Sequence, residues 1–184
     1  MGTQLNQNTG FSVNSGPYTY QGGELYTWAY NGYGNLGDGT TTNRTTPGKV
    51  GTLTNWSDIN YGYYSFVALK SDGTMWTCGY NTYGNMGNGT TVFYSSPVQV
   101  GSLSTWSKIS YKNAHAAAIK TDGTLWTWGY NGTGQLGNNT SGYTGNFSAY
   151  NYSSPIQVGN LTTDRKSTRL NSSHVKRSRM PSSA

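Results

Sequence analysis

The sequence predicts an all-β fold made of repeated units, and three observations support this prediction. The 184 residues include 26 Gly and 16 Tyr, whereas charged residues make up only 10% of the chain. Glycine and aromatic residues disfavour helices, so strands and turns are expected instead. Stretches rich in β-branched and aromatic residues are separated by Asp-Gly, a strong signal for a β-hairpin. The same pattern returns every 50 residues, starting at Gly23, Gly73 and Gly123.

The middle of the chain illustrates the predicted strands in order. Residues 56–61 alternate between apolar and polar side chains and predict a short strand. Residues 66–70 and 74–78 flank Asp72-Gly73 and predict a hairpin. Residues 98–100 follow a proline and predict a fourth strand, because proline is tolerated at a strand start or a sheet edge. Four short strands in a repeated unit are typical of a β-propeller blade.

The repeated motif resembles a known family. Gly-x-Leu-Trp-x-Trp-Gly-x-Asn-x-x-Gly-Gln-Leu-Gly is complete from Gly123 to Gly137 and resembles the regulator-of-chromosome-condensation repeat. The second unit departs from the motif at Cys78 and Met86, and the first departs from it at Ala29. The resemblance covers residues 23–163, as units 23–72, 73–122 and 123–163. In that family about seven blades close a ring. The resemblance therefore implies an incomplete β-propeller of about three four-stranded blades, whose missing blades are expected partners.

The two ends of the chain depart from the repeat. Residues 1–22 do not align with it, so we expect an irregular segment or a degenerate part of a blade. Residues 1–10 are polar and lack the charged-then-apolar pattern of a signal peptide. Residues 164–184 contain six Lys or Arg residues and one Asp, whereas the rest of the chain is nearly neutral. The stretch 164–174, DRKSTRLNSSH, resembles the translation of a sequencing adaptor, so we expect 164–184 to be an artefactual, disordered tail.

The alternative for this tail is a basic segment that binds nucleic acid. On the adaptor interpretation, nucleic acid is not an expected partner. Membrane insertion is not expected either, because no apolar run approaches the roughly 20 residues that span a bilayer.

Two glycine-rich segments match a dinucleotide-binding pattern. Gly32–Gly37 and Gly132–Gly137 read G-x-G-x-x-G, but turn residues follow where a phosphate-binding helix would have to begin. The second unit has Thr82 in place of the first glycine. We therefore expect these glycines to supply left-handed turns and to bind no cofactor.

Other residues with reactive side chains are also expected to be structural. His115 has no nucleophile or carboxylate in a triad-like arrangement, and Asp72 and Asp122 occupy turns. Cys78 takes the place of a tryptophan and is expected to be a small buried hydrophobe. We also expect Trp126, Trp128 and Tyr130 to lie in the core of a strand. The sequence thus predicts no catalytic residue, metal site or enzymatic activity.

One loop departs from the period of the repeat. The third unit carries an insertion of eight residues within 139–152, rich in Tyr, Ser, Gly and Asn. This composition is typical of adaptable binding loops. The alternative is a neutral surface loop, since extra loop length is tolerated at little cost. The candidate binding residues are Tyr143, Phe147, Tyr150 and Tyr152.

These observations favour a non-enzymatic scaffold that binds a protein or a glycan. Low charge and abundant Tyr, Asn, Gly and Thr suit a virion or extracellular surface, so a phage or bacterial surface protein is one interpretation. The resemblance alone implies an alternative, a guanine-nucleotide exchange factor-like regulator of a small GTPase. A carbohydrate-binding surface module is a third hypothesis. Nothing in the nearly neutral residues 1–163 forms a basic stripe suited to chromatin, and fold does not fix function.

Overall fold

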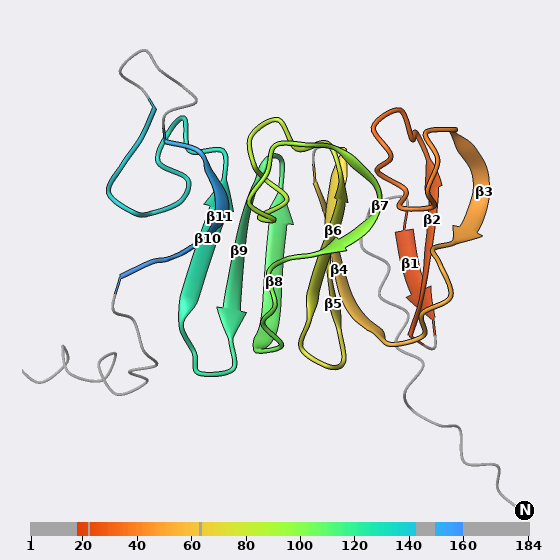
Figure 1. Ribbon diagram of the computed structural model, residues 1–184, viewed down its shortest axis with the longest axis horizontal. Helices are drawn as coiled ribbons and strands as arrows, with labels where there is room; N and C mark the ends of the chain where they lie inside the picture. The colour runs from red at the N-terminus through yellow and green to blue at the C-terminus, as the bar shows by residue number, and fades with distance from the viewer. Residues whose placement is uncertain (1–17, 22, 63, 143–149, 160–184) are drawn as a thin grey trace, which may run out of the picture.

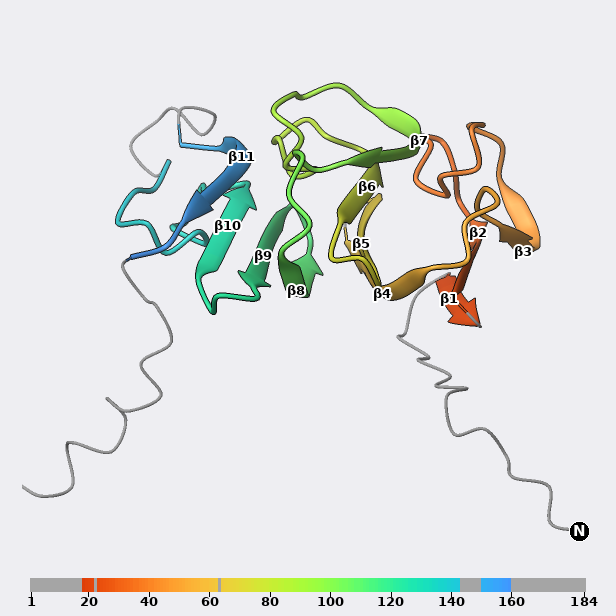
Figure 2. The ribbon, with the colours of Figure 1, turned by 60° about the horizontal axis from the view of Figure 1, so that its bottom comes forward.

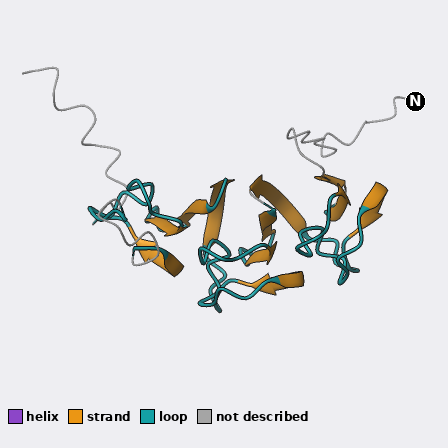
Figure 3. Ribbon diagram, turned by 90° about the horizontal axis from the view of Figure 1, so that it is seen from above, coloured by secondary structure: helices purple, strands orange, loops and turns teal. Residues whose placement is uncertain are grey.

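The computed structural model describes residues 18–21, 23–62, 64–142 and 150–159. These residues form eleven strands in three antiparallel sheets, which stand side by side in an arc (Figures 1 and 2). Figure 3 shows the arc from above. The prediction of an all-β, incomplete propeller is confirmed. Segments 1–17 and 164–184, for which sequence predictions were made, lie outside the described residues. Within the described ranges, no helix could cross a membrane.

Each sheet follows the chain from strand to strand. The first sheet consists of β1 (Tyr18–Gln21), β2 (Glu24–Ala29) and β3 (Arg44–Lys49). The second consists of β4 (Trp56–Gly62), β5 (Ser65–Lys70), β6 (Met75–Gly79) and β7 (Tyr94–Gln99). The third consists of β8 (Trp106–Lys112), β9 (His115–Lys120), β10 (Leu125–Gly129) and β11 (Tyr152–Gln157). The first sheet thus has three described strands, where four were predicted.

The outer strands begin earlier than the sequence predicted. β7 starts at Tyr94, so Pro97 lies inside this strand and not before it. β11 likewise starts at Tyr152 and contains Pro155. Both are edge strands of their sheets, where a missing N–H group can face away from the ladder. The pairing of β7 with β6 also shifts register between Thr77 and Gly79.

The sheets are offset from the repeat by half a unit. Residues 73–122 supply β6 and β7 of the second sheet, and then β8 and β9 of the third. Where the chain crosses, the backbone N–H of Trp106 donates to the carbonyl of Gly73 over 3.1 Å. Trp56 donates in the same way to Gly23 over 2.9 Å. The units 23–72 and 73–122 therefore each link two neighbouring sheets.

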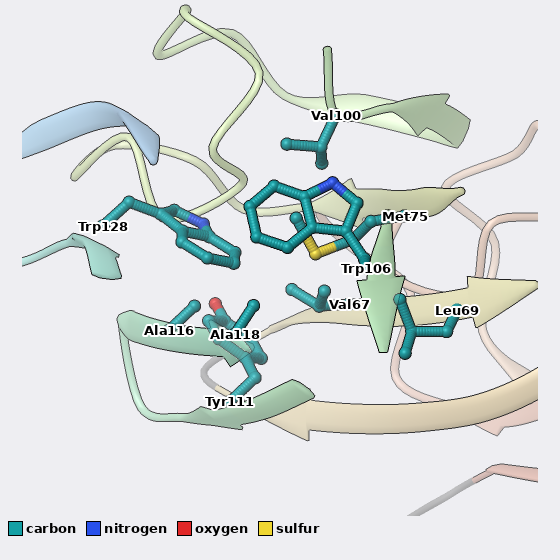
Figure 4. Packing of buried hydrophobic residues seen from close by; sticks show 9 residues of the cluster. All are labelled: Val67, Leu69, Met75, Val100, Trp106, Tyr111, Ala116, Ala118 and Trp128. Atoms are coloured by element: carbon teal, nitrogen blue, oxygen red, sulfur yellow. The ribbon is translucent and has the colours of Figure 1, made fainter. Parts of the chain in front are cut away.

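Two apolar clusters fill the spaces between neighbouring sheets, and tryptophan and phenylalanine side chains contribute much of their bulk. The cluster between the first and second sheets contains Leu25, Val50, Trp56, Ile59, Phe66, Ala68 and Cys78. The cluster between the second and third sheets contains Val67, Leu69, Met75, Val100, Trp106, Tyr111, Ala116, Ala118 and Trp128 (Figure 4).

Equivalent cross-strand pairs in the two clusters place their large and small side chains on opposite strands. Phe66 pairs with Cys78 across β5 and β6, whereas Ala116 pairs with Trp128 across β9 and β10. Each pair combines one large and one small side chain, and all four residues are buried. Such compensation keeps the volume of a close-packed core. The prediction for Cys78 is confirmed, and burial raises the pKa of its thiol.

A buried polar bridge joins the second and third sheets. Nδ2 of Asn85 donates hydrogen bonds to Oγ of Ser65 (3.1 Å) and to the hydroxyl of Tyr111 (2.7 Å). The hydroxyls of Ser65 and Tyr111 lie 2.5 Å apart. Burial raises the pKa of Tyr111 to about 12. Asn35 and Tyr61 repeat the bridge between the first and second sheets over 2.7 Å.

We expect Gly87→Ala to destabilise the protein more than Gly101→Ala does. Both glycines have left-handed backbones, with φ of 73° and 63°, so alanine costs each about 1–2 kcal/mol. A Cβ atom at Gly87 would also lie 2.5 Å from Nε1 of Trp128, whereas one at Gly101 would meet nothing within 4 Å. Overpacking adds about 1–3 kcal/mol. Urea unfolding measures both losses, and equal losses would contradict the close approach of the sheets.

The raised pKa of Tyr111 predicts a loss of stability at alkaline pH. An unfolded tyrosine titrates near pH 10, whereas folding favours the neutral phenol. The contribution of the neutral Tyr111 phenol to the free energy of unfolding is therefore complete below about pH 10. This contribution falls by about 3 kcal/mol as the pH rises to about 12. Tyr111→Phe removes this contribution. The difference in unfolding free energy between wild type and variant should shrink over this pH range, and a constant difference would refute the assignment.

Candidate functional site

Three equivalent loops lie at one end of the sheets. They follow β2, β6 and β10, which all run towards the top of Figure 1. Each loop begins with a tyrosine and a buried asparagine, as Tyr30-Asn31, Tyr80-Asn81 and Tyr130-Asn131. The Asp-Gly turns between the paired strands β5–β6 and β9–β10 lie at the opposite end.

The buried asparagine fixes the shape of each loop. Oδ1 of Asn31 accepts a hydrogen bond from the backbone of Leu36 (2.9 Å). Its Nδ2 donates to Oδ1 of Asp38 (3.2 Å) and to the carbonyl of Thr40 (3.1 Å). An amide side chain can make both kinds of bond, since it carries an acceptor and two donors. Equivalent bonds fix the other two loops, from Asn81 to Met86 and Thr90 and from Asn131 to Leu136 and Thr140.

The predicted turn role of the glycines is confirmed in these loops. Gly34, Gly84 and Gly134 have φ of 73°, 68° and 84°, a conformation that favours glycine. Gly32 lacks a positive φ, and Thr82 replaces it in the second unit. In the described part of the chain no helix follows these glycines, so the loops do not have the geometry that holds a dinucleotide.

A continuous row of aromatic rings crosses the three loops. Neighbouring ring centroids lie 5.0 to 6.2 Å apart, in edge-on or tilted arrangements favoured by aromatic pairs. These contacts connect the loop of the first sheet to the loop of the third. We call this row the aromatic strip, and its members are Tyr30, Tyr33, Tyr64, Tyr80, Tyr83, Phe93 and Tyr130.

Part of the aromatic strip is presented to solvent. Tyr30, Tyr64 and Phe93 are 46%, 38% and 42% exposed. Tyr33 is half-buried, and its ring contacts these three rings and that of Tyr80. The inner rings therefore hold the outer ones in place. Contiguous exposed apolar surface of this kind marks interaction sites.

The surroundings of the aromatic strip carry little unbalanced charge. Asp38 forms an ion pair with Arg44 over 3.2 Å. Burial raises the pKa of Asp38, but hydrogen bonds from Thr40 and Asn31 and the charge of Arg44 outweigh this effect and lower it. A hollow of about 380 Å³ lies beside Tyr64, and Lys112 is among its lining residues.

The acidic candidate residues stabilise the turns in which they lie. Oδ1 of Asp72 accepts hydrogen bonds from the backbone and hydroxyl of Thr74, as predicted for a turn residue, and these bonds lower its pKa. Asp122 makes the same bonds to Thr124. His115 is half-buried in β9, and burial lowers its pKa. Within the described ranges, no group of three or more His, Cys, Asp or Glu residues could hold a metal ion.

The predicted binding loop is only partly described. Tyr143 and Phe147 lie outside the described residues. Tyr150 is half-buried, whereas Tyr152 begins β11 and packs against the apolar cluster between the second and third sheets. Next to them, Oδ1 of Asn151 accepts a hydrogen bond from the backbone N–H of Asn131 (3.0 Å). The far end of the insertion is thus attached to the loop of Tyr130.

The sequence analysis missed the aromatic strip. Trp128 lies in the core as predicted, but the prediction for Tyr130 is wrong, because this residue follows β10 and its half-buried ring packs against Tyr83 in the loops. Gly129 has φ of 95°, which ends β10 and turns the chain before Tyr130. The available signal was a Tyr-Asn pair directly after the last strand residue in all three units.

The chain was compared with protein families and with known proteins. The family model described as "Regulator of chromosome condensation (RCC1) repeat" matches residues 22–69, 72–119 and 122–171. A second model of the same description matches 56–85 and 106–135. The third match reaches residue 171, inside segment 164–184, whose interpretation as an artefact stays a prediction. No curated protein matched the sequence.

Solved structures share the fold. Prp20p from Saccharomyces cerevisiae superposes with a TM-score of 0.66 at 17% identity, over 79% of this chain and 36% of its own. Human WBSCR16 superposes with a TM-score of 0.63 at 18% identity, over 77% of this chain and 36% of its own. This chain therefore spans about a third of the length of these proteins, and the likeness concerns the fold alone.

We expect Asn81→Ala to destabilise the protein by about 2–3 kcal/mol, because buried backbone groups of Met86 and Thr90 lose their partners. Thr82→Ala is the matched control, since Thr82 is exposed and adjacent, and it should change stability by less than about 0.5 kcal/mol. Thermal and urea unfolding measure both changes. Similar values for the two variants would mean that the asparagine does not fix the loop.

Proposed function

We propose that this chain, which belongs to the regulator of chromosome condensation (RCC1) repeat family, is a non-enzymatic binding scaffold. The observation that carries this proposal is the aromatic strip. It exposes Tyr30 and Phe93 on loops held by buried asparagines, and Tyr64 on the turn between β4 and β5. The facing sides of neighbouring sheets are committed to packing against one another. The loops after β2, β6 and β10 are therefore the surface that is free to bind a partner.

The strip has the properties of a contact surface for a macromolecule. Tyrosine presents a large, rigid area with a polar tip, and it is enriched among the residues that dominate binding energy. Ring contacts such as those of Tyr33 restrict the strip before binding, which reduces the entropy lost on association. The pairing of Asp38 with Arg44 favours recognition by shape and hydrogen bonds over recognition by charge.

We propose a protein as the partner. Prp20p is described as binding Gsp1p and histones, and yeast RCC1 (Prp20) has been solved as the partner of Kap60. These complexes support a protein partner for this chain in a general way. A glycan is the second candidate, supported by the neutral, tyrosine-rich strip. The exchange-factor alternative rests on the family resemblance, and a virion or extracellular location stays a prediction.

The test removes the two exposed tyrosines of the strip. We expect Tyr30→Ala with Tyr64→Ala to weaken binding at least about 30-fold, because the loss of even one residue that dominates an interface costs about 2 kcal/mol. Leu53→Ala with Leu103→Ala is the matched control, because these leucines have similar exposure. Binding is measured with immobilised protein against an extract of the source and against a glycan array. Signal on the array alone would select the glycan.

Unfolding curves must first establish that both double variants are folded. Undiminished binding by the tyrosine variant would then refute the role of the strip. Deleting eight residues within 139–152 tests the predicted binding loop separately. If only this deletion reduced binding, the binding site would lie on the insertion and not on the aromatic strip.

A further inference from the structure

We propose that a hollow between the second and third sheets binds a small carboxylate with a compact apolar body. This inference is independent of the aromatic strip, because none of the strip residues lines the hollow. It rests on three side-chain donors among the lining residues. It also rests on a comparison with the equivalent hollow between the first and second sheets, where an acceptor replaces one of these donors.

The hollow has a volume of about 240 Å³, and both sheets line it. The second sheet contributes Asn88, from the loop after β6, and Val100, which follows β7. The third sheet contributes Trp106 on β8, Trp126 on β10 and Pro155 on β11. Apolar walls with a few polar groups are typical of ligand pockets, and those for drug-sized ligands measure roughly 300–1,000 Å³. The ligand of this hollow is therefore small.

The first donor is a buried indole N–H group without an acceptor. Trp106 is 4% exposed, and its Nε1 has no hydrogen-bond partner among the described residues. Figure 4 shows this nitrogen on the side of the ring that points towards Val100, another lining residue. The neighbouring Trp126 differs, because its Nε1 donates to Oγ1 of Thr124 (2.8 Å). A buried donor without an acceptor is unfavourable, so a ligand that accepts a hydrogen bond is stabilised here.

The second donor is the ammonium group of Lys120, which contacts two indole rings. Its Nζ lies 3.5 Å from the ring centroid of Trp126 and 5.0 Å from that of Trp106. Within the described ranges Lys120 forms no ion pair, and the nearby Asp122 accepts hydrogen bonds from Thr124 instead. Lys120 is only 9% exposed. Because a buried cation is normally paired, an anionic ligand suits this group.

The third donor is the side-chain amide of Asn88. Its Oδ1 accepts hydrogen bonds from the backbone (3.2 Å) and hydroxyl (3.0 Å) of Thr90, and from Nδ2 of Asn81 (3.4 Å). These bonds fix the orientation of the amide. In the described part of the chain its Nδ2 donates to no protein atom. A carboxylate only accepts hydrogen bonds, so it is the group that matches three donors.

The equivalent hollow between the first and second sheets has the opposite polarity at one position. Its volume is about 220 Å³, and it is lined by Trp56, whose Nε1 also has no partner among the described residues. Asp38 takes the place of Asn88, and its Oδ2 accepts a hydrogen bond from Arg44 (3.2 Å). A charged acceptor therefore lies where the other hollow has a donor. Because it disfavours a carboxylate, we expect one site per chain.

The experiment titrates the full 184-residue chain with 3-phenylpropionate, using calorimetry and NMR of the indole N–H groups. One molecule should bind per chain, and the indole signal of Trp106 should move more than the others. The spectrum of Trp106→Phe identifies this signal by its loss. The neutral isostere 3-phenylpropionamide should bind at least about 10-fold more weakly, because hydrogen bonds to a charged group are stronger.

Two outcomes of this titration would overturn the proposal. One is the absence of binding at millimolar ligand, which would mean that water satisfies the indole of Trp106. The other is equal affinity for the acid and the amide, which would mean that the hollow selects only an apolar body.

Asn88→Asp tests the position at which the two hollows differ. It should weaken binding of 3-phenylpropionate at least about 10-fold, because a charged acceptor replaces a donor. Asn138→Asp is the matched control. Asn138 accepts the equivalent loop bonds from Asn131 and Thr140 but does not line the hollow, so the affinity should stay unchanged. Equal affinities for the two variants would contradict the proposal.

Lys120→Met removes the second donor, and Lys70→Met is its matched control. Each lysine has its Nζ 3.5 Å from the centroid of the nearer indole ring, so the two substitutions should destabilise the fold similarly. Unfolding curves establish that both variants are folded. Only Lys120→Met should weaken binding, at least about 10-fold, because Lys70 does not line this hollow. Undiminished affinity of Lys120→Met, or equal losses in both variants, would overturn the proposal.

Discussion

The structure depends on the fact that an inner sheet is apolar on both faces and needs a neighbour on each side. β5 shows this constraint, because its side chains alternate between the two clusters. Phe66 faces the first sheet and Val67 faces the third. Burying a side chain of this kind stabilises the fold by about 1.5–3 kcal/mol, so an uncovered face forfeits several such contributions. Glycines such as Gly87 let the sheets approach closely enough to exclude water.

Because of the same constraint, the strands of each unit serve packing, whereas its loops are available for binding a partner. Because both faces of the inner sheet are occupied, a partner can reach only the ends of this sheet. At one end the loops are held from inside by Asn31, Asn81 and Asn131, which are completely buried. The side chains above them can then change without disturbing the packing. Residues on a rigid frame of this kind lose little entropy when they bind.

The sequence predicts what depends on neighbours along the chain and misses what depends on contacts between units. The period, the Asp-Gly turns and the buried role of Cys78 follow from local patterns. The exchange of sizes between Phe66–Cys78 and Ala116–Trp128 was visible in the sequence only once the strand register was known. The aromatic strip joins residues as distant as Tyr33 and Phe93 through ring contacts, which no periodicity encodes. Tyr130 was misplaced because the alternation continues past Gly129, whereas the strand does not.

The offset between repeat and sheet has a consequence for how such a gene can grow. A duplicate of the unit 73–122 would first complete the sheet before it and then begin the next one, because this unit carries the second half of one sheet and the first half of another. The new junction would reproduce an existing one, down to the bond from Trp106 to Gly73. Recombination between repeats can therefore change the number of blades in whole steps without creating an unpaired strand.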